Sequence, residues 1–581
     1  MAVLKYKKNG VWYEVNAGSS AGVADNQQTE ITIASIIDAL SVPVLAPKAT
    51  WYKGNTAKAD ITAIHVVNKY TATGSEVESW AADEAGVGTI MCYVNGTELT
   101  ICCDRARGIA LNPNSDNALS WFTNATVFTG QEFLKMERVS YAYQMCMGSA
   151  FTELGDPSWN FARIYSFAFA FCSMPNLTSI DLGKSTLASL DSAQAMFSGD
   201  AALKYFIAPE LRMDNTRVTM AMFYGCSSLE SIDLGESTFD GTVPASNMFN
   251  GCTSLVSVGM PMATFEAVTD ASGMFRNCTS LENIAWKATF AHATDISRMF
   301  HKCSALKTID LSRANLSNVT TCNGMFASVD WSTAETGMHI EKIIGIETLN
   351  LSNCADFASM FYGCHHLTEL DLSLWNVSKG TNFSHMFADM SGLTKLTLDD
   401  GKGNAWNPIS AVTFNCMFND NMTEELDISC FASAKAMSLC QMFERFAGTI
   451  VGYDKLDTSE TTEMAQMFIS TNMEVLDLSG YDTRKVSGSV KSGDTQSEAG
   501  FTDMLTSANY LKEIRLGVNF DTRGDGTLSE AQAFVLPTPN SAYIPGADGF
   551  WYEEDGTQYD PALPPNPAVL GRAITLYAVK P

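Results

Sequence analysis

Residues that could do chemistry are few and scattered in this chain. Of the seven histidines, His365 and His366 are adjacent, and they could ligate a metal ion or fill a half-exposed structural position. The loop that begins at Asp521 and ends at Glu530 has part of the spacing of a calcium-binding loop. Arg523 stands at its third ligand position and the twelfth position also lacks a carboxylate, so an ordinary acidic turn is the alternative.

The sequence motifs of common catalytic and metal centres are missing. The sequence shows no P-loop, no HExxH pair, no Ser/His/Asp set and no CxxC pair with zinc spacing. We therefore expect no enzyme activity, no cofactor and no metal centre.

Residues suited to binding a partner are easier to find. Asp233, Asp310 and Asp371 recur at equivalent positions of short apolar segments. They would form an acidic stripe for a cationic ligand or calcium, or else an ordinary solvated face. Trp331 and Trp406 lie in stretches that interrupt the spacing of these segments. Because an exposed tryptophan is a preferred contact for a sugar or a protein, we expect both to contribute to binding.

A sequence repeat must position these candidates. Met-Phe pairs recur every 25 or 26 residues, apart from two gaps of 35 and 31 residues. Their aromatic members are Phe197, Phe223, Phe249, Phe275, Phe300, Phe326, Phe361, Phe387, Phe418, Phe443 and Phe468. Such a period marks a stack of one supersecondary unit, which buries its apolar face only against its neighbours. We expect these phenylalanines to form one buried column.

Each unit is predicted to carry one short strand. Apolar residues follow each phenylalanine after six, nine and eleven positions, as in Leu229, Ile232 and Leu234. The last two alternate with a polar residue, which is strand periodicity. Strands separated by about twenty residues cannot be hairpin partners, so we expect a parallel sheet. Thr or Asp before the Met-Phe step predicts a short helical or 3₁₀ turn on the opposite face.

The repeated unit has a specific sequence motif. It is seen in Met222-Phe-Tyr-Gly-Cys-Ser-Ser-Leu-Glu-Ser-Ile-Asp-Leu234 and in Met299-Phe-His-Lys-Cys-Ser-Ala-Leu-Lys-Thr-Ile-Asp-Leu-Ser312. These segments resemble the BspA-type leucine-rich repeat, and the resemblance extends over residues 145–516. It implies a leucine-rich-repeat-like solenoid. Members of that family are adhesins and surface proteins, and similar arrays occur in virion proteins of gut bacteriophages. The resemblance therefore implies binding rather than catalysis.

Composition restricts the partners. Hydrophobic residues make up 46% of the chain, and the net charge is −27. Phosphates would be repelled by this charge, so we expect neither nucleic acid nor an anionic membrane surface as a partner. No stretch of eighteen apolar residues occurs, so membrane insertion is not expected either.

The N-terminal sequence bears on where the protein works. Residues 1–15 have neither the apolar core nor the cleavage site of an export signal. We therefore expect a bacteriophage virion structural protein, such as a tail fibre, baseplate or head decoration protein, that is made in the host cytoplasm and binds a host surface glycan or protein. The alternative is a BspA-like bacterial surface adhesin or protein-interaction module.

Cysteines follow the repeat. Of fifteen cysteines, those three residues after a repeat phenylalanine are Cys226, Cys252, Cys278, Cys303 and Cys364. They could form a disulfide or metal ladder, but a column of buried free thiols explains the same placement. We expect free thiols in a chain that folds in a reducing cytoplasm.

Four parts are predicted along the chain. They are an attachment hairpin and helix (1–40), a β-rich N-terminal cap (41–140), the solenoid (141–516) and a C-terminal cap (517–581). Caps are expected because the open ends of a solenoid are exposed sheet edges. Strands are predicted at 63–67, 89–94 and 98–102, with an Asn95-Gly96 turn between the last two.

The N-terminal hairpin and three insertions are predicted to make contacts outside the stack. The hairpin is turned by Asn9-Gly10, and its Tyr6, Trp12 and Tyr13 are candidates for attachment to virion proteins as part of a homo-oligomer. A linker at 18–28 and a helix at 29–40 would follow it. Insertions near 330–344, 399–408 and 484–500 break the period and are expected to form loops that bind partners.

Overall fold

The computed structural model describes residues 3–8, 11–16, 43–67, 69, 78–86, 89–103, 108–328, 339–399, 401, 406–492 and 498–581, with the backbone alone in the first two segments. The chain divides into two compact units, Met1–Val42 and Pro43–Pro581. Among the described residues, no helix combines the length and the apolar character that crossing a membrane requires.

In the first unit, β1 (Val3–Lys8) and β2 (Val11–Asn16) pair in antiparallel fashion, with Tyr6 opposite Tyr13 and Lys7 opposite Trp12. The predicted N-terminal hairpin is therefore confirmed. Its Asn9-Gly10 turn, the linker at 18–28 and the helix expected at 29–40 lie outside the described residues.

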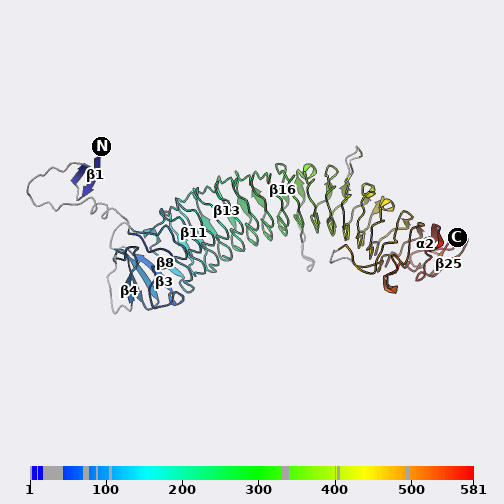
Figure 1. The fold of residues 1–581 in the computed structure, drawn as a ribbon, viewed down its shortest axis with the longest axis horizontal. Helices are drawn as coiled ribbons and strands as arrows, with labels where there is room; N and C mark the ends of the chain where they lie inside the picture. The colour runs from blue at the N-terminus through cyan, green and yellow to red at the C-terminus, as the bar shows by residue number, and fades with distance from the viewer. Residues whose placement is uncertain are drawn as a thin grey trace, which may run out of the picture. The chain divides into compact units, whose positions relative to one another are not determined.

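The second unit, taken by itself, is an elongated stack of turns (Figure 1). Each turn contributes one short strand to a parallel ladder, as predicted. The strands are β10 (Glu153–Gly155), β11 (Ser179–Asp181), β12 (Tyr205–Ile207), β13 (Ser231–Asp233), β14 (Ser257–Gly259), β15 (Asn283–Ala285), β16 (Thr308–Asp310), β17 (Lys342–Ile344), β18 (Glu369–Asp371), β19 (Lys395–Thr397), β20 (Glu425–Asp427), β21 (Thr449–Val451), β22 (Val475–Leu478) and β23 (Glu513–Leu516). The fold is a leucine-rich-repeat solenoid.

Strands pair in a constant register that keeps one residue of each strand in the core. Ile180 lies opposite Phe206 and Ile232 opposite Val258, while the residues on either side of them point outward. The ladder is interrupted after β12, β15, β17, β19 and β21, so it consists of short sheets in series. A second column, of single parallel bridges such as Ser166 to Ser192, runs beside the core.

The Met-Phe steps form turns, not helices. The residue before each methionine has a positive φ, as in Ala195 (48°), Ala221 (56°) and Asn247 (57°). Backbone N–H groups there alternate between a carbonyl three residues back and a carbonyl of the next turn. Met196 N donates to Ala193 O, whereas Phe197 N donates to Met222 O at 2.8 Å. The i to i−3 bonds are of the 3₁₀ type, but the left-handed residue prevents a helix from continuing. Short 3₁₀ helices occur instead after strands, as η3 (Ile346–Thr348), η4 (Ser429–Phe431) and η5 (Tyr453–Lys455).

The repeat phenylalanines form a buried stack of nearly parallel rings, as predicted. Phe197, Phe223, Phe249, Phe275 and Phe300 are all fully buried. Their successive ring centroids lie 5.2, 5.6, 5.4 and 5.9 Å apart. The predicted cysteine column is buried as well, and each Sγ donates to the carbonyl of the phenylalanine one turn earlier, at 3.0 to 3.3 Å.

The N-terminal cap is a five-stranded sheet with the order β4-β5-β6-β3-β8. Its strands are β3 (Ala63–Val67), β4 (Glu78–Ala81), β5 (Met91–Asn95), β6 (Glu98–Cys102) and β8 (Val127–Thr129), accompanied by η1 (Lys58–Asp60), η2 (Gln131–Phe133), β7 (Ile109–Ala110) and β9 (Leu134–Lys135). The β5–β6 hairpin is confirmed, although Asn95 pairs with Glu98, so its central residues are Gly96 and Thr97. Gln131 closes the edge of β10, because its side chain accepts from Gly155 N at 2.7 Å and donates to Glu153 O at 3.3 Å.

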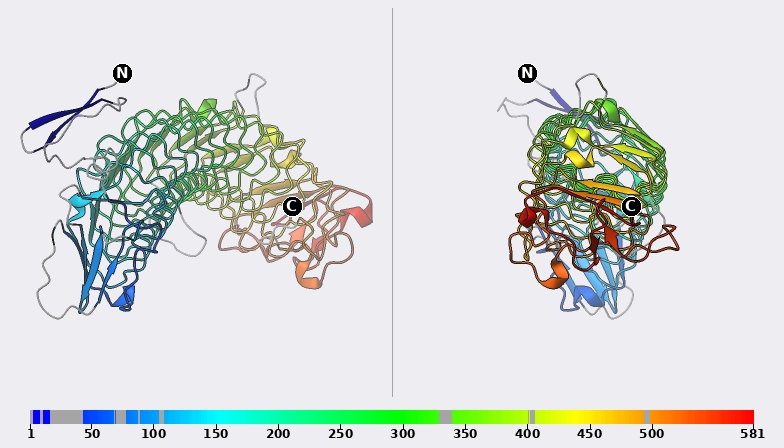
Figure 2. Two further views of the ribbon diagram at one scale, coloured as in Figure 1. Left: turned by 60° about the vertical axis from the view of Figure 1, so that its left-hand side comes forward. Right: turned by 90° about the vertical axis from the view of Figure 1, so that its right-hand side faces the viewer.

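The C-terminal cap covers the last strand of the ladder. β26 (Ile574–Tyr577) pairs antiparallel with β23 and carries β24 (Trp551–Tyr552) and β25 (Gln558–Tyr559) beyond it. The cap also contains η6 (Glu530–Gln532) and α2 (Pro567–Leu570). Figure 2 shows these segments at the end of the stack.

Candidate functional site

The recurrent aspartates terminate the strands of the ladder. In each of six turns, the aspartate Oδ1 accepts a hydrogen bond from the backbone N–H two residues later, at 2.7 to 3.0 Å. These residues are Asp181, Asp233, Asp310, Asp371, Asp427 and Asp477. The side chain thus forms an Asx turn that ends the strand. This local role explains why aspartate recurs there.

The three aspartates proposed to contact a partner are exposed but not adjacent. Asp233, Asp310 and Asp371 end β13, β16 and β18, and residues such as Gly259, Ala285 and Ile344 separate them along the column. At about 4.8 Å per strand, Asp310 lies roughly 14 Å from Asp233. Hydrogen bonds from Ser312 hold the pKa of Asp310 below its ordinary value, so this carboxylate stays ionised. Only its outward oxygen is available to a partner.

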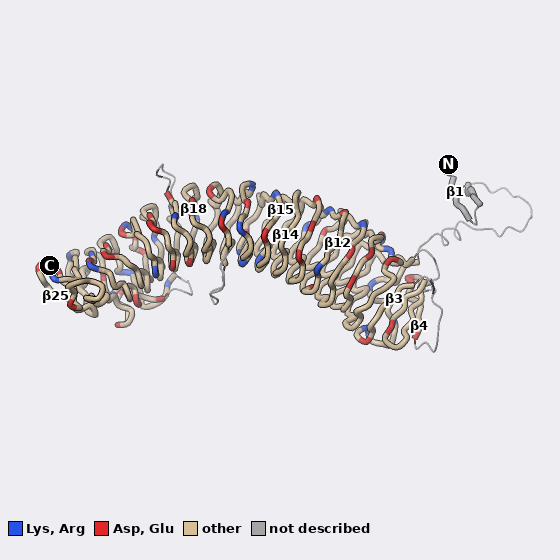
Figure 3. Tube along the Cα trace, turned by 180° about the vertical axis from the view of Figure 1, so that it is seen from behind, with Lys and Arg blue, Asp and Glu red and all other residues tan. Residues whose placement is uncertain are grey.

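The strand face is hollowed over β17–β20. One hollow of about 550 Å³ lies between β19 and β20 and is lined by Glu369, Lys395, Asp399, Glu424, Glu425 and Asp427. A second, of about 300 Å³, shares Glu369 and includes Glu341, Lys342 and Asp371. We call the two together the strand-face groove. Along the rest of the stack, acidic and basic residues are interspersed (Figure 3).

Trp406 is a core residue, which corrects the expectation that it is exposed. Only 1% of its surface is accessible, and its indole N–H donates to Leu372 O at 2.8 Å. Its ring lies parallel to those of Trp375 and Phe431, with centroids 6.4 and 6.2 Å away. Trp406 N donates to Leu398 O, so the chain that leaves the stack after β19 rejoins it at this residue. The large side chain then fills the interior of the turn. Trp331 lies outside the described residues.

The first insertion is shorter than the sequence indicated. Residues 342–344, which were expected within it, form β17 and pair in regular register with β16. The inserted residues therefore precede β17, and 329–338 lie outside the described part of the chain.

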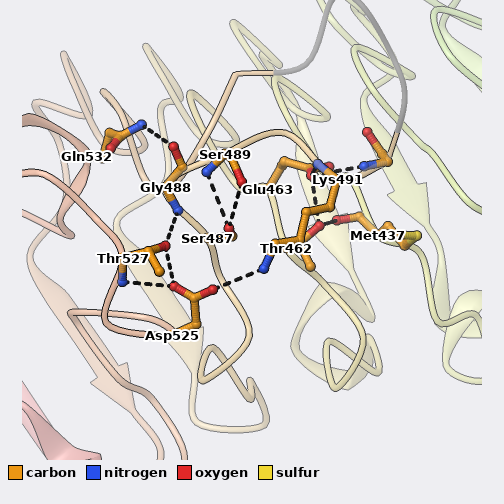
Figure 4. Close-up of polar contacts among 11 residues, drawn as sticks. Met437, Thr462, Glu463, Ser487, Gly488, Ser489, Lys491, Asp525, Thr527 and Gln532 are labelled. Carbon is orange, nitrogen blue, oxygen red and sulfur yellow. Dashed lines mark hydrogen bonds and ion pairs between the residues drawn. The ribbon is translucent and has the colours of Figure 1, made fainter.

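A buried carboxylate holds the third insertion (Figure 4). Glu463 is fully buried, and its Oε1 accepts from the backbone N–H groups of Lys491 and Ser492 at 2.5 and 3.1 Å. The Thr462 hydroxyl donates to the same oxygen at 2.8 Å. Lys491 Nζ then pairs with Asp525 Oδ2 at 3.0 Å, which ties the insertion to the next turn. No sequence pattern pointed to Glu463, because its partners are backbone groups of a distant loop.

The loop proposed for calcium is occupied by protein donors. Asp521 Oδ1 accepts from Arg523 N and from Asn566 Nδ2, at 2.9 and 2.8 Å. Asp525 Oδ1 accepts from the backbone and hydroxyl of Thr527. These contacts are those of an acidic turn. Across the described segments, no group of three His, Cys, Asp or Glu side chains could hold a metal ion.

One serine, histidine and aspartate lie close together, which the sequence did not indicate. Ser391 Oγ is 2.9 Å from His365 Nδ1, and His365 Nε2 is 3.7 Å from Asp389 Oδ2. Burial raises the pKa of Asp389, an effect that His365 opposes. In earlier turns the residue at the Ser391 position, such as Thr253 or Thr279, donates to a carbonyl of the preceding turn. Ser391 stands at the same repeat position, but its hydroxyl contacts the His365 ring instead of a carbonyl.

The repeats match a described family. Residues 140–262 match the BspA type leucine-rich repeat region (6 copies). This part of the chain is therefore similar to leucine-rich repeats of the BspA type. Residues 243–335, 330–450 and 412–492 match a Mycoplasma protein family of unknown function, DUF285. The BspA-type repeats indicate a surface or protein-interaction module.

The chain is also similar to a solved structure of a leucine-rich-repeat protein. The LRR protein LIC12759 of Leptospira interrogans is similar with 13% sequence identity over 57% of this chain and 67% of that chain, at a TM-score of 0.20. No curated protein matches the chain.

Proposed function

We propose that the protein is a recognition scaffold that binds a macromolecular partner through the strand face of its stack. The observation that carries this proposal is the strand-face groove, an open surface on which outward-pointing charged side chains, such as Glu369, Lys395 and Glu425, lie beside apolar residues of the core. The middle residue of each strand fills the core while its neighbours point outward. Outward residues can therefore suit a partner without disturbing the packing.

A charge reversal tests the groove against a matched position. Glu424 and Glu282 are both exposed and each precedes a strand, β20 and β15 respectively, but only Glu424 lines the groove. With labelled full-length protein and intact bacterial cells, Glu424→Lys should weaken saturable binding severalfold and Glu282→Lys should not. Equal effects of the two variants would contradict a site in the groove.

The proposed function includes no catalytic role. Ser391 stands at a repeat position where other turns carry a structural hydroxyl, and His365 Nε2 is 3.7 Å from Asp389 Oδ2, so we expect Ser391 to be unreactive. A fluorophosphonate probe applied to the folded protein should leave Ser391 unlabelled. Labelling of Ser391 that disappears in His365→Ala would establish a nucleophile and contradict this part of the proposal.

The more specific role that we propose is that of a bacteriophage virion protein whose stack binds a host surface glycan or protein. It is supported by the separate N-terminal unit, whose two-stranded hairpin is too small to be stable alone. Tyr6, Trp12 and Tyr13 belong to this hairpin and would attach it to virion proteins, within a homo-oligomer.

Deletion of residues 1–28 tests the attachment role. The truncated chain should fold but should be lost from purified particles, as measured by mass spectrometry. Particles that still incorporate the truncated chain would contradict attachment through the hairpin. Recovery of the full-length protein from a bacterial cell surface, and not from particles, would favour an adhesin.

A further inference from the structure

Two thiols meet inside the stack at the turn that carries the first insertion. Cys322 Sγ lies 3.4 Å from Cys354 Sγ, and both side chains are fully buried. Both sulfurs also lie near the carbonyl oxygen of Asp356, at 3.5 and 3.4 Å. Met360 Sδ lies 3.6 Å from Cys322 Sγ. The two cysteines are therefore already in van der Waals contact.

The repeat itself shows that this pair is unusual. Cys322 follows the bridge residue Thr321, and Cys354 lies two residues before the partner of that bridge, Asp356. One turn earlier the equivalent residues are Ile296 and Val319, and before them Ala271 and Ala293, all of them buried. Apolar contacts suffice at this place in these two turns. Thiols replace both partners together where the period lengthens.

The contact also differs from that of the repeat-column cysteines. In that column each thiol donates to a backbone carbonyl, as Cys303 Sγ does to Phe275 O at 3.0 Å. Cys322 and Cys354 belong to neighbouring turns, and their thiols instead face each other. A disulfide S–S bond is about 2.05 Å long, so the two sulfurs need to approach by roughly 1.3 Å, a shift within reach of side-chain rotation.

We propose that Cys322 and Cys354 are an oxidation site that forms a disulfide when the chain folds in a medium containing a small-molecule disulfide. The thiolate of one cysteine attacks the reagent and releases one small thiol, giving a mixed disulfide. The second cysteine then displaces the other small thiol. Two protein S–H bonds are replaced by one S–S bond, and the reagent is reduced to two thiols.

The position of the bond gives it a structural effect. It joins two neighbouring turns and closes a loop of the chain that runs from Cys322 to Cys354. A cross-link of this kind restricts the unfolded chain and stabilises the folded one. Burial raises the pKa of the Cys322 thiol well above its ordinary value, which disfavours the reactive thiolate in the folded protein. The exchange therefore takes place during folding or when these turns open locally.

Peptide mapping of the refolded full-length protein tests the proposal. The chain is refolded with reduced and oxidised glutathione, alkylated, and cleaved after Lys and Arg and before Asp. Cleavage before Asp356 separates Cys354 from Cys364, so the proposed bond links peptides 314–329 and 343–355. We expect this linked pair, the loss of two of the fifteen thiols and a higher Tm than that of the reduced protein.

Two variants complete the test. Cys354→Ala should retain every remaining thiol after the same refolding, whereas Cys303→Ser, in the repeat column, should still form the linked pair. Refolded wild-type protein with all fifteen thiols alkylated would overturn the proposal. Cross-links spread among the column cysteines would overturn it as well.

Discussion

At the scale of single residues, the position three places after a repeat phenylalanine is buried and takes side chains of different kinds. In several turns cysteine serves there as a small buried donor to the carbonyl one turn earlier. Asn421 makes the same contact, because its Nδ2 donates to Phe387 O at 3.0 Å. Asp200 differs from both, since its Oδ1 accepts from Met174 N at 2.7 Å and its buried Oδ2 has no hydrogen-bond partner among the described residues.

Asp200→Asn should stabilise the protein at neutral pH. Burial raises the pKa of Asp200 well above its ordinary value of 3.8, so folding penalises the ionised carboxylate. The stability that the protonated carboxyl of Asp200 provides is fully present below pH 3.8. It is lost as the pH rises through the pKa that this group has in the folded protein. Urea unfolding of both proteins at neutral and acidic pH measures this. The advantage of the variant should shrink in acid, and a constant difference would contradict the assignment.

Phe275→Ala should lower the free energy of unfolding by about 3–5 kcal/mol, because it leaves a cavity between two stacked rings. Phe550→Ala is the control, since Phe550 is 37% exposed in the C-terminal cap and should cost far less. Denaturant unfolding followed by circular dichroism compares the two. Similar losses for both variants would mean that the ring stack is not the source of stability.

At the scale of elements, an Asx turn follows the strand in six turns of the stack. Asp310 shows the arrangement, with its Oδ1 accepting from both the backbone N–H and the hydroxyl of Ser312, at 2.9 and 2.6 Å. The same carboxylate is thus a structural residue and a candidate for partner contact. The two roles can be separated by substitution.

Asp310→Ala should lower the free energy of unfolding by about 1 kcal/mol, because the turn loses its acceptor. Asp310→Asn should cost less, since the amide oxygen still accepts, while the negative charge is removed. Thermal unfolding of the two variants measures the turn, and partner binding measures the charge. A cost for Asn equal to that for Ala would show that the charge, not the hydrogen bond, supports the turn.

The sequence was sufficient to predict the strands, the ring stack and the thiol column, because Phe and the apolar strand residues recur at a constant spacing and Cys recurs at the same place in five units. It was not sufficient for the Met-Phe turn, whose left-handed residue is Ala, Asn, Gly, Arg, Ser, His, Cys or Gln in different units and so leaves no constant signature. Trp406 was misjudged because the return of the chain into the core is a property of the fold. The Glu463 contacts join turns through backbone groups, which composition does not reveal.

At the scale of the whole molecule, the two caps solve the problem of open sheet edges in different ways. At the start, a glutamine side chain bridges β8 of the N-terminal cap and β10. At the end, the antiparallel strand β26 covers β23. Unpaired strand edges recruit other chains, so both devices should keep the stack from associating end to end.

Removal of residues 574–581 should therefore cause association. The backbone groups of β23 that pair with β26 would become free to bind another chain. Removal of the exposed residues 579–581 alone is the control and should have no such effect. Light scattering over a range of concentrations compares the two proteins. A monodisperse 574–581 deletion would show that β26 is not needed to protect the edge.

The contacts of each turn with its immediate neighbours also govern how such a molecule can change in length. Phe223, Phe249 and Phe275 occupy the same place in successive turns, 26 residues apart. Loss of one such segment through recombination would bring Phe223 against Phe275 in an equivalent setting. The gene can therefore gain or lose whole turns while the two caps and the binding residues of the other turns stay the same. The length of the stack can thus evolve independently of the partner that it binds.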